Sequence, residues 1–185
     1  MAEGQLRLTV VGSAAAWSRQ PGRASSCYLV ELDGHGLVMD FGQGAFSALS
    51  AYRDPQDVRA ILVSHLHPDH GIDLVPLRHY LQYGTQPPAS LELHAPADIR
   101  RRYDVLVGEE DFLASLPGEP LEPGTLELPP FEVTVGAVTH KEPSFAFRVA
   151  PLVGGDDRAS RPGGSRSGAP RGLVYSGDCG REEDL

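Results

Sequence analysis

The chain has 185 residues, of which 25 are acidic and 16 basic, so its formal net charge at pH 7 is −9. Such an acidic chain lacks the broad basic face that holds nucleic acid, although a bound metal could offset the charge locally. Hydrophobic residues make up 41% of the sequence, which is enough for a core and excludes wholesale disorder. No stretch approaches the roughly 18 consecutive apolar residues of a membrane span. The length fits one domain or a piece of a larger one.

The cysteine content indicates a reducing compartment. Cys27 and Cys179 lie far apart in the sequence and form no CxxC pair. The first apolar run, 6–11, is too short for a secretory signal and has no small-residue cleavage site after it. We therefore expect a cytoplasmic protein without a disulfide framework.

Strands joined by glycine turns are predicted for the first third of the chain. The runs 27–32 and 37–40 flank the turn Asp33-Gly34-His35-Gly36, a pattern typical of a hairpin. The apolar run 60–64 shows no alternation, which predicts a strand buried on both faces. A first strand is expected at 6–11 and a short helix at 45–52.

Helices and strands are both predicted farther along. Leu74, Leu77 and Leu81 recur at helical spacing, with Pro76 tolerable only in the first turn of the helix. This order of elements indicates a layered α/β domain. The remaining elements are a helix at 97–107 and strands at 91–94, 125–128, 131–138, 145–149 and 173–176.

Residues 154–172 break the composition, because they are rich in Gly, Arg and Ser. We interpret this segment as a flexible surface insert that cannot bury enough apolar area to become ordered. The alternative is an arm that grips substrate phosphates through its four arginines, Arg158, Arg161, Arg166 and Arg171. The segment is short for such an arm.

The strongest chemical signal is the run Ser64-His65-Leu66-His67-Pro68-Asp69-His70, directly after a predicted buried strand. A strand that ends in a tight loop can aim His65 and His67 at one point, while Asp69 and His70 turn toward another nearby. Neutral imidazoles and a carboxylate suit zinc and similar divalent ions. The alternative is a solvated histidine-rich turn.

Two residues elsewhere fit the same constellation. His140 follows the predicted strand 131–138, and Asp178 follows the strand 173–176. Either residue alone would be interpreted as an ordinary surface residue. Beside the histidine cluster, both are candidate metal ligands.

These motifs, together with Met39-Asp40-Phe41-Gly42 and Tyr175-Ser176-Gly177-Asp178, resemble the metallo-β-lactamase-fold hydrolase superfamily. The resemblance implies an αββα sandwich in the α/β class, of which this chain would hold the first half and the start of the second. It covers most of the chain and implies one domain over residues 1–185, which is incomplete at its C-terminus and carries the flexible insert 154–172.

The resemblance also implies a dinuclear site of two divalent ions, zinc in preference to manganese or iron. His65, His67 and His140 would bind one metal, Asp69 and His70 the second, and Asp178 would bridge them. His67 stands where the diiron branch carries Glu, which favours a zinc-type hydrolase. Asp69 and Asp178 would also position the attacking water. The weaker candidates for substrate contact are Ser144 and Arg148.

Several stretches look most similar to the tRNase Z-like and cyclic-nucleotide phosphodiesterase-like branch. They are Ser25-Ser26-Cys27-Tyr28-Leu29-Val30, the residues after His140, and the Tyr-Ser-Gly-Asp ending. True tRNase Z enzymes carry a long RNA-gripping arm that 154–172 does not match. A small anionic phosphodiester such as a cyclic nucleotide is therefore expected in preference to pre-tRNA. We also expect no membrane partner, and we expect the chain to assemble as a homodimer.

Two other functions fit the same residues. The site could hydrolyse a thioester, a lactone or a β-lactam, or the chain could be a catalytically inactive metal-binding scaffold. The family supplies a last metal-binding His and a catalytic His beyond the position of Asp178, and this sequence has neither. We therefore expect the chain to be a fragment. His35, His79 and His94 are expected to be ordinary surface or packing residues.

Overall fold

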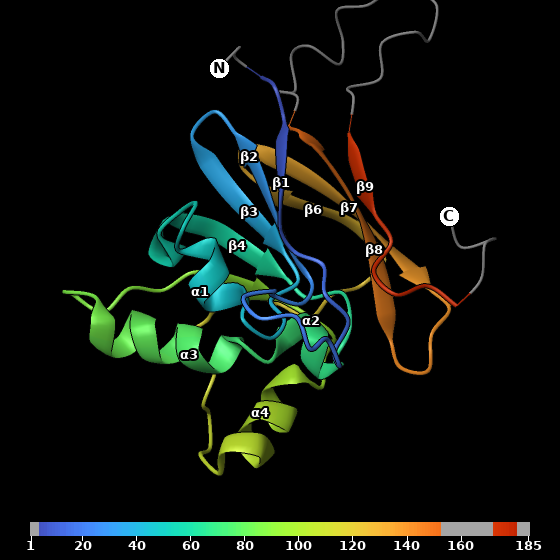
Figure 1. The fold of residues 1–185 in the computed structure, drawn as a ribbon. Helices are drawn as coiled ribbons and strands as arrows, with labels where there is room; N and C mark the ends of the chain where they lie inside the picture. Colours follow the sequence, from blue (N-terminus) through green and yellow to red (C-terminus); the bar gives the residue numbers. More distant parts are fainter. Residues whose placement is uncertain (1–3, 153–171, 181–185) are drawn as a thin grey trace, which may run out of the picture.

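The computed structural model describes residues 4–152 and 172–180. Its first sheet has the strand order β1-β2-β3-β4-β5 (Figure 1). The hairpin β2–β3 is antiparallel, as predicted, whereas β4 joins β3 and β5 in parallel. The five strands are β1 (Arg7–Gly12), β2 (Cys27–Leu32), β3 (His35–Met39), β4 (Val58–Leu62) and β5 (Glu92–His94).

The second sheet is antiparallel throughout and has the order β6-β7-β8-β9. Within the described residues, β9 pairs with β8 and forms an edge of this sheet. Its strands are β6 (Gly124–Leu128), β7 (Phe131–Val138), β8 (Ser144–Pro151) and β9 (Leu173–Tyr175).

Short helices connect the strands of the first sheet. The helix predicted from Leu74, Leu77 and Leu81 is α3, which continues into a π-helical turn, Tyr80–Gly84. Among the described residues, no helix is long and apolar enough to cross a membrane. The helices are α1 (Ala45–Leu49), α2 (Pro68–Gly71), α3 (Leu74–His79) and α4 (Ile99–Val107), with a 3₁₀ turn at Pro55–Asp57.

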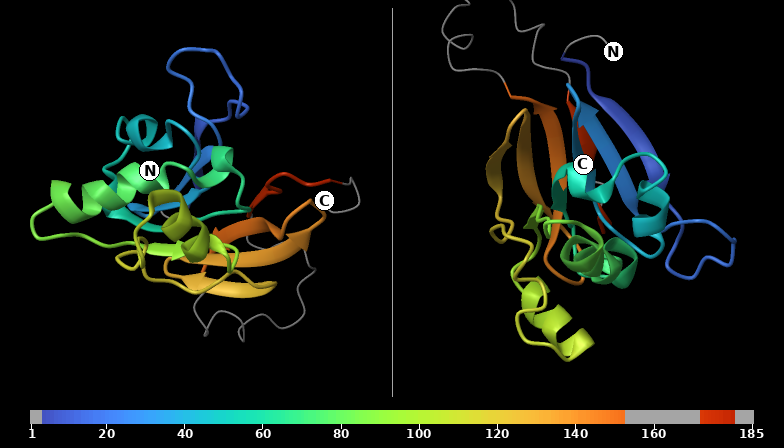
Figure 2. Two further views of the ribbon diagram at one scale, coloured as in Figure 1. Left: turned by 90° about the horizontal axis from the view of Figure 1, so that it is seen from below. Right: turned by 90° about the vertical axis from the view of Figure 1, so that its left-hand side faces the viewer.

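Two apolar cores lie on opposite faces of the first sheet. Because successive side chains of a strand point to opposite faces, Leu37 and Met39 of β3 pack against the second sheet, whereas Val38 packs under the helices. Strand β4 divides its apolar residues in the same way, so the prediction of a strand buried on both faces is confirmed. Figure 2 shows the resulting layers, with helices, first sheet and second sheet in that order.

The predicted elements are present, with bounds that differ by a few residues. His35 opens β3, so the expected Asp33–Gly36 turn is shorter than predicted, because the hairpin pairing already begins at Leu32 and His35. Helix α2 was not predicted. The insert 154–172 lies outside the described residues except for Gly172, and a second helical layer is not among the described residues.

Candidate metal centre

The histidine run lies where β4 leaves the first sheet. Ser64 and His65 continue the buried path of the strand, and the chain then turns into α2 at Pro68. Proline suits the first turn of a helix, because its fixed φ is helical and its missing N–H would have no helical partner there. This early turn places His67, just before the helix, and His70, within it, close to His65.

Three imidazole nitrogens converge at this point. His65 Nε2 lies 2.9 Å from His67 Nδ1, and His140 Nε2 lies 3.3 Å from the same atom. With a carboxylate oxygen of Asp178, these ligand atoms all lie within 4.8 Å of one another. Nitrogen ligands at 2.0–2.1 Å from a tetrahedral zinc are about 3.4 Å apart, so the donor set fits such an ion.

The other predicted ligands lie beside this group. His70 Nε2 is 3.5 Å from Asp178 Oδ1 and 3.8 Å from Asp69 Oδ2. The carboxylate of Asp178 therefore stands between the three-histidine group and the pair Asp69 and His70. The six predicted site residues lie close together, with His65, His67, His140 and Asp178 in one group and with Asp69 and His70 beside it.

Asp40 is the central residue beneath the site, and sequence analysis gave it no role. It is fully buried directly after β3, in a left-handed backbone conformation with φ of 59°. One carboxylate oxygen accepts a hydrogen bond from the backbone N–H of Ser64 at 2.7 Å. The other accepts from Ser64 Oγ at 2.9 Å, from His70 Nδ1 at 2.6 Å and from the Tyr175 hydroxyl.

This network orients the histidine rings. Because Ser64 Oγ donates its proton to Asp40, it is an acceptor for the Nδ1–H of His65, which lies 3.1 Å away. His65 is thereby left with an unprotonated Nε2 that faces the other imidazoles. His70 likewise donates its Nδ1–H to Asp40 and points Nε2 toward the carboxylates. Such carboxylate–histidine contacts fix the tautomer of metal-ligating histidines.

Burial and charge change the protonation of these groups. Burial, together with the charge of a protonated His70, lowers the pKa of His65 from 6.5 to about 4, so the ring is neutral at pH 7. Burial alone would lower the pKa of His70, but the hydrogen bond to Asp40 and the charge of this carboxylate outweigh it and raise the pKa. Burial and the adjacent Asp40 raise the pKa of Tyr175, which keeps its hydroxyl protonated as a donor.

The carboxylate of Glu142 lies near Nε2 of His67, the ring nitrogen that does not face the other imidazoles. His67 Nε2 is 3.9 Å from Glu142 Oε1, and Arg102 of α4 pairs with Glu142 at 2.9 Å. Glu142 follows the second sheet's strand β7, whereas Arg102 belongs to the helical layer. The pair therefore joins the two layers at the edge of the histidine group.

Glycine is required at two close approaches around the site. A Cβ on Gly42 would lie 1.9 Å from the backbone oxygen of Asp69. Gly177 adopts a positive φ of 60°, and a Cβ there would lie 2.9 Å from Cβ of Ser64. Both glycines let the loops that carry the acidic residues pack directly against the β4 loop.

The three histidines outside this constellation make the ordinary surface or packing contacts that were expected of them. His79 contacts the Val75 carbonyl, His94 contacts Glu92 and the Glu119 carbonyl, and His35 is exposed. Ser144 Oγ donates to the backbone oxygen of Asp178 at 3.4 Å, which supports the loop of that ligand. The signal that could have identified Asp40 is an acidic residue immediately after an apolar strand.

Comparisons with known proteins agree on one family. The family profile described as "Metallo-beta-lactamase superfamily" matches residues 21–153. The uncharacterized protein ML1173 of Mycobacterium leprae is 31% identical over 192 residues, which is 97% of this chain and 60% of the relative. The chain thus spans about 60% of the length of that relative.

Two further proteins are similar over smaller regions. Ribonuclease Z of Ignicoccus hospitalis is 34% identical over 114 residues, which covers 59% of this chain and 33% of the relative. The crystal structure of the metallo-beta-lactamase fold protein YhfI from Bacillus subtilis superposes with a TM-score of 0.66 at 24% identity. That match covers 80% of this chain and 58% of YhfI, and it supports the fold.

Proposed function

Since the chain belongs to the metallo-β-lactamase superfamily, we propose that it is a metal-dependent hydrolase that cleaves phosphodiester bonds in small anionic substrates. The observation that carries the proposal is the convergence of His65, His67, His140 and Asp178 within 4.8 Å. Neutral imidazoles with carboxylates are a donor set that suits zinc. His70 and Asp69, adjoining through Asp178, support a second ion.

Two bound divalent ions would lower the pKa of a bound water molecule and would offset the negative charge of the substrate. The carboxylates of Asp69 and Asp178 would bind the ions and would also position the attacking water. Their side chains are 20% and 54% exposed, so water reaches both from solvent. His70 is held by Asp40 through Nδ1 and points its Nε2 toward the two carboxylates.

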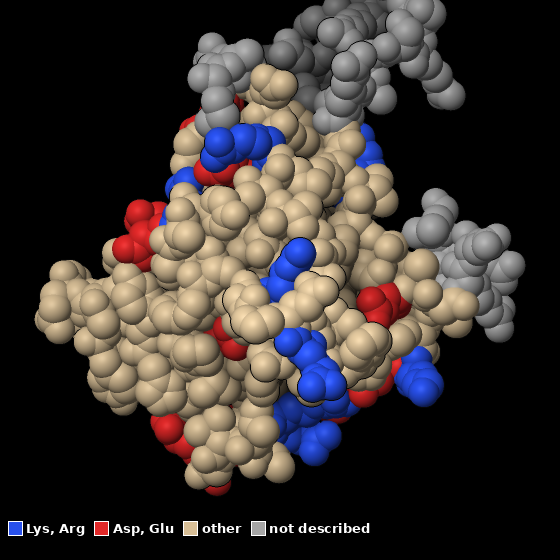
Figure 3. Space-filling model, in the orientation of Figure 1, with Lys and Arg blue, Asp and Glu red and all other residues tan. Residues whose placement is uncertain are grey.

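A phosphodiester is the preferred substrate class because of the similarity to Ribonuclease Z, whose name denotes cleavage of such bonds in RNA. A small substrate is preferred to nucleic acid because the three arginines of α4, beside the site, are already engaged within the protein. Figure 3 shows basic side chains gathered near α4. Arg100 bonds to the carbonyls of Leu113 and Leu116, Arg101 pairs with Asp98, and Arg102 pairs with Glu142.

The test is a substrate panel on the zinc- or manganese-loaded protein, with bis(p-nitrophenyl) phosphate, cyclic AMP, pre-tRNA and nitrocefin. We expect turnover of the small phosphodiesters, a loss of at least about 100-fold in His67→Ala, and near-normal turnover in His79→Ala. Histidine 79 is the matched control because it lies on α3 away from the site.

Two results would contradict the proposal. Nitrocefin turnover without phosphodiester cleavage would assign the site to another electrophile. Stable metal binding without hydrolysis of any of the four compounds would make the chain a metal-binding scaffold.

A further inference from the structure

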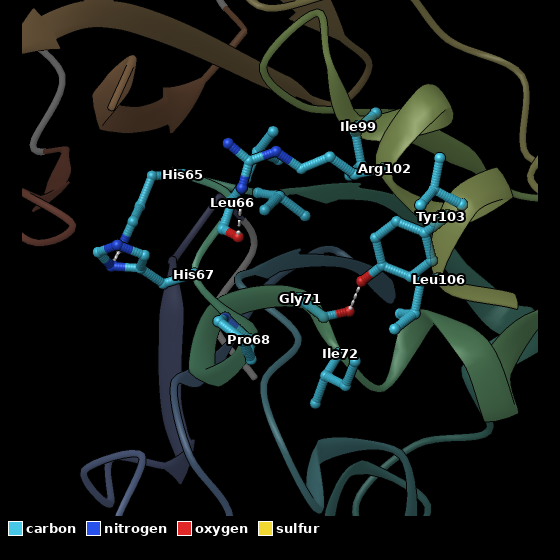
Figure 4. A pocket seen from close by; sticks show the side chains of 12 residues that line it. His65, Leu66, His67, Pro68, Gly71, Ile72, Ile99, Arg102, Tyr103 and Leu106 are labelled. Carbon is cyan, nitrogen blue, oxygen red and sulfur yellow. Dashed lines mark hydrogen bonds between the residues drawn. The ribbon is translucent and has the colours of Figure 1, made fainter. Parts of the chain in front are cut away.

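An apolar pocket of about 320 Å³ opens beside the histidine group, between α2 and α4 (Figure 4). This volume is at the small end for ligand sites and about twice that of a cavity that binds benzene, so it accommodates a group of one or two rings. Leu106 and Val105, at its rim, are 57% and 75% exposed, although both are large apolar side chains. Its lining includes Ile72, Ile99, Arg102, Tyr103 and Leu106.

The pocket adjoins the candidate metal centre. His65 and His67 belong both to its lining and to the group of converging ligands. A molecule whose reacting group lies at the histidines can therefore place a neighbouring group between the two helices. This adjacency distinguishes the pocket from an isolated apolar depression on the surface.

The polar side chains of the lining are already paired within the protein. The Tyr103 hydroxyl donates to the carbonyl of Gly71, and burial raises its pKa, so it stays neutral. The charge of Arg102 is offset by Glu142 at 2.9 Å. The nearest walls are otherwise aliphatic, and Figure 4 shows Leu106, Ile72 and Ile99 around the opening. The occupant is thus recognised by shape and apolar contact, with neither a charge nor hydrogen-bonding groups required.

We propose that this pocket binds an uncharged aromatic group of the substrate, attached to the anionic ester that lies at the histidine group. The proposal rests on the proposed function for the nature of the ester, but the binding of the ring does not depend on hydrolysis. It makes the enzyme selective for the size of the ester group next to the scissile bond.

The first experiment measures phenol binding to the metal-free protein in EDTA by isothermal titration calorimetry. We expect saturable binding that Leu106→Trp abolishes, because the larger side chain fills the opening. The matched control is Val107→Trp, on the same helix but outside the lining, which should bind phenol as the unmodified protein does. Both positions are exposed, so both variants are expected to fold.

The second experiment compares two phosphodiesters with the same leaving group, bis(p-nitrophenyl) phosphate and methyl p-nitrophenyl phosphate. The kcat/KM ratio of the aryl to the methyl ester should fall about tenfold in Leu106→Trp and stay within about twofold in Val107→Trp. Phenol binding without any hydrolysis would leave the pocket supported and the proposed function wrong.

Three results would overturn the pocket assignment. They are the absence of phenol binding, binding that Leu106→Trp leaves unchanged, and a kcat/KM ratio equally insensitive to both tryptophan variants. A change confined to the sedimentation coefficient of Leu106→Trp would instead assign this surface to contact between copies of the chain.

Discussion

Asp40 connects the two groups of candidate ligands through one buried carboxylate. Ser64 and His70 both donate to it, and through Ser64 it also sets the tautomer of His65. A fully buried carboxylate is costly unless its oxygens are paired, and here five donors pair them, the fifth being the Ser26 hydroxyl at 3.4 Å. We infer that Asp40 positions the ligands rather than contacting the substrate.

The variant Asp40→Asn should weaken metal binding about 10- to 100-fold, because the amide cannot accept from all of these donors and presents donors of its own. The free energy of unfolding should fall by about 1–3 kcal/mol. Zinc titration against a chelating dye and urea denaturation measure the two effects.

Asp33→Asn is the matched control. Asp33 also has a positive φ, of 47°, but is exposed in the β2–β3 turn. Asparagine tolerates this backbone conformation, so both variants keep the backbone comparable. Equal zinc affinity in Asp40→Asn and Asp33→Asn would show that Asp40 does not support the ligands.

The lowered pKa of His65 predicts a specific pH dependence of stability in the metal-free protein. Between pH 6.5 and about 4, the unfolded chain protonates His65 while the folded chain keeps it neutral. Protonation therefore favours unfolding, and this residue costs about 3 kcal/mol of stability as the pH falls through that range. His65→Gln should remove the part of the stability loss that comes from this residue. Urea denaturation in EDTA at pH 7 and pH 4 measures the free energy of unfolding of both proteins.

The exposed His35 provides the control for this measurement. His35→Gln should reproduce the pH profile of the unmodified protein, in which carboxylates also titrate. Parallel profiles for His65→Gln and the unmodified protein would show that the ring of His65 is not held neutral by the fold.

At the scale of elements, the site depends on close packing between the loop after β3 and helix α2. Phe41 of this loop donates its backbone N–H to the backbone oxygen of His70, and Ser26, just before β2, donates its backbone N–H to the backbone oxygen of Asp69. Gly42 lies in the same loop, where any Cβ would overlap the Asp69 backbone. These contacts hold the acidic end of the motif against the buried Asp40.

Gly42→Ala should lower the free energy of unfolding by roughly 2 kcal/mol or more, because the backbone of α2 must move. It should also reduce zinc affinity, because Asp69 and His70 move with the helix. Gly136→Ala in β7 is the control, since nothing lies within 4 Å of a Cβ there. Thermal unfolding and zinc titration of both variants check this, and equal values for the two would contradict the packing described.

The elements that sequence analysis predicted are those with a clear hydrophobic pattern, either periodic or continuous. The run 60–64 is apolar at every position but the last, and a strand with two buried faces has that composition. Helix α2 has four residues, which is too short for a helical period to be seen. It also lies within the histidine motif, where residue types follow the chemistry of the site.

At the scale of the whole molecule, the site lies where three distant segments meet. His65 to His70 follow β4 of the first sheet, whereas His140 and Asp178 follow β7 and β9 of the second. The face-to-face packing of the two sheets therefore brings the ligands together. Sequence motifs could identify these residues, since each stands next to a predicted strand end.

The contacts around the ligands could not be predicted in the same way. The pairing of Asp40 with Tyr175, or of Arg102 with Glu142, depends on how the sheets and α4 are placed in space. Neither pair has a characteristic spacing along the chain. The apolar pocket has the same origin, because α4 must pack beside α2 before its lining exists.

The central claim is that both sheets together build a metal site, and His140 tests it most directly because it is the histidine that the second sheet contributes. The measurement is zinc content per chain by mass spectrometry after dialysis against metal-free buffer. We predict at least one zinc in the unmodified protein and in His79→Ala, and about a tenth of that or less in His140→Ala. Equal zinc content in His140→Ala and the unmodified protein, or no retained zinc in either, would contradict the account.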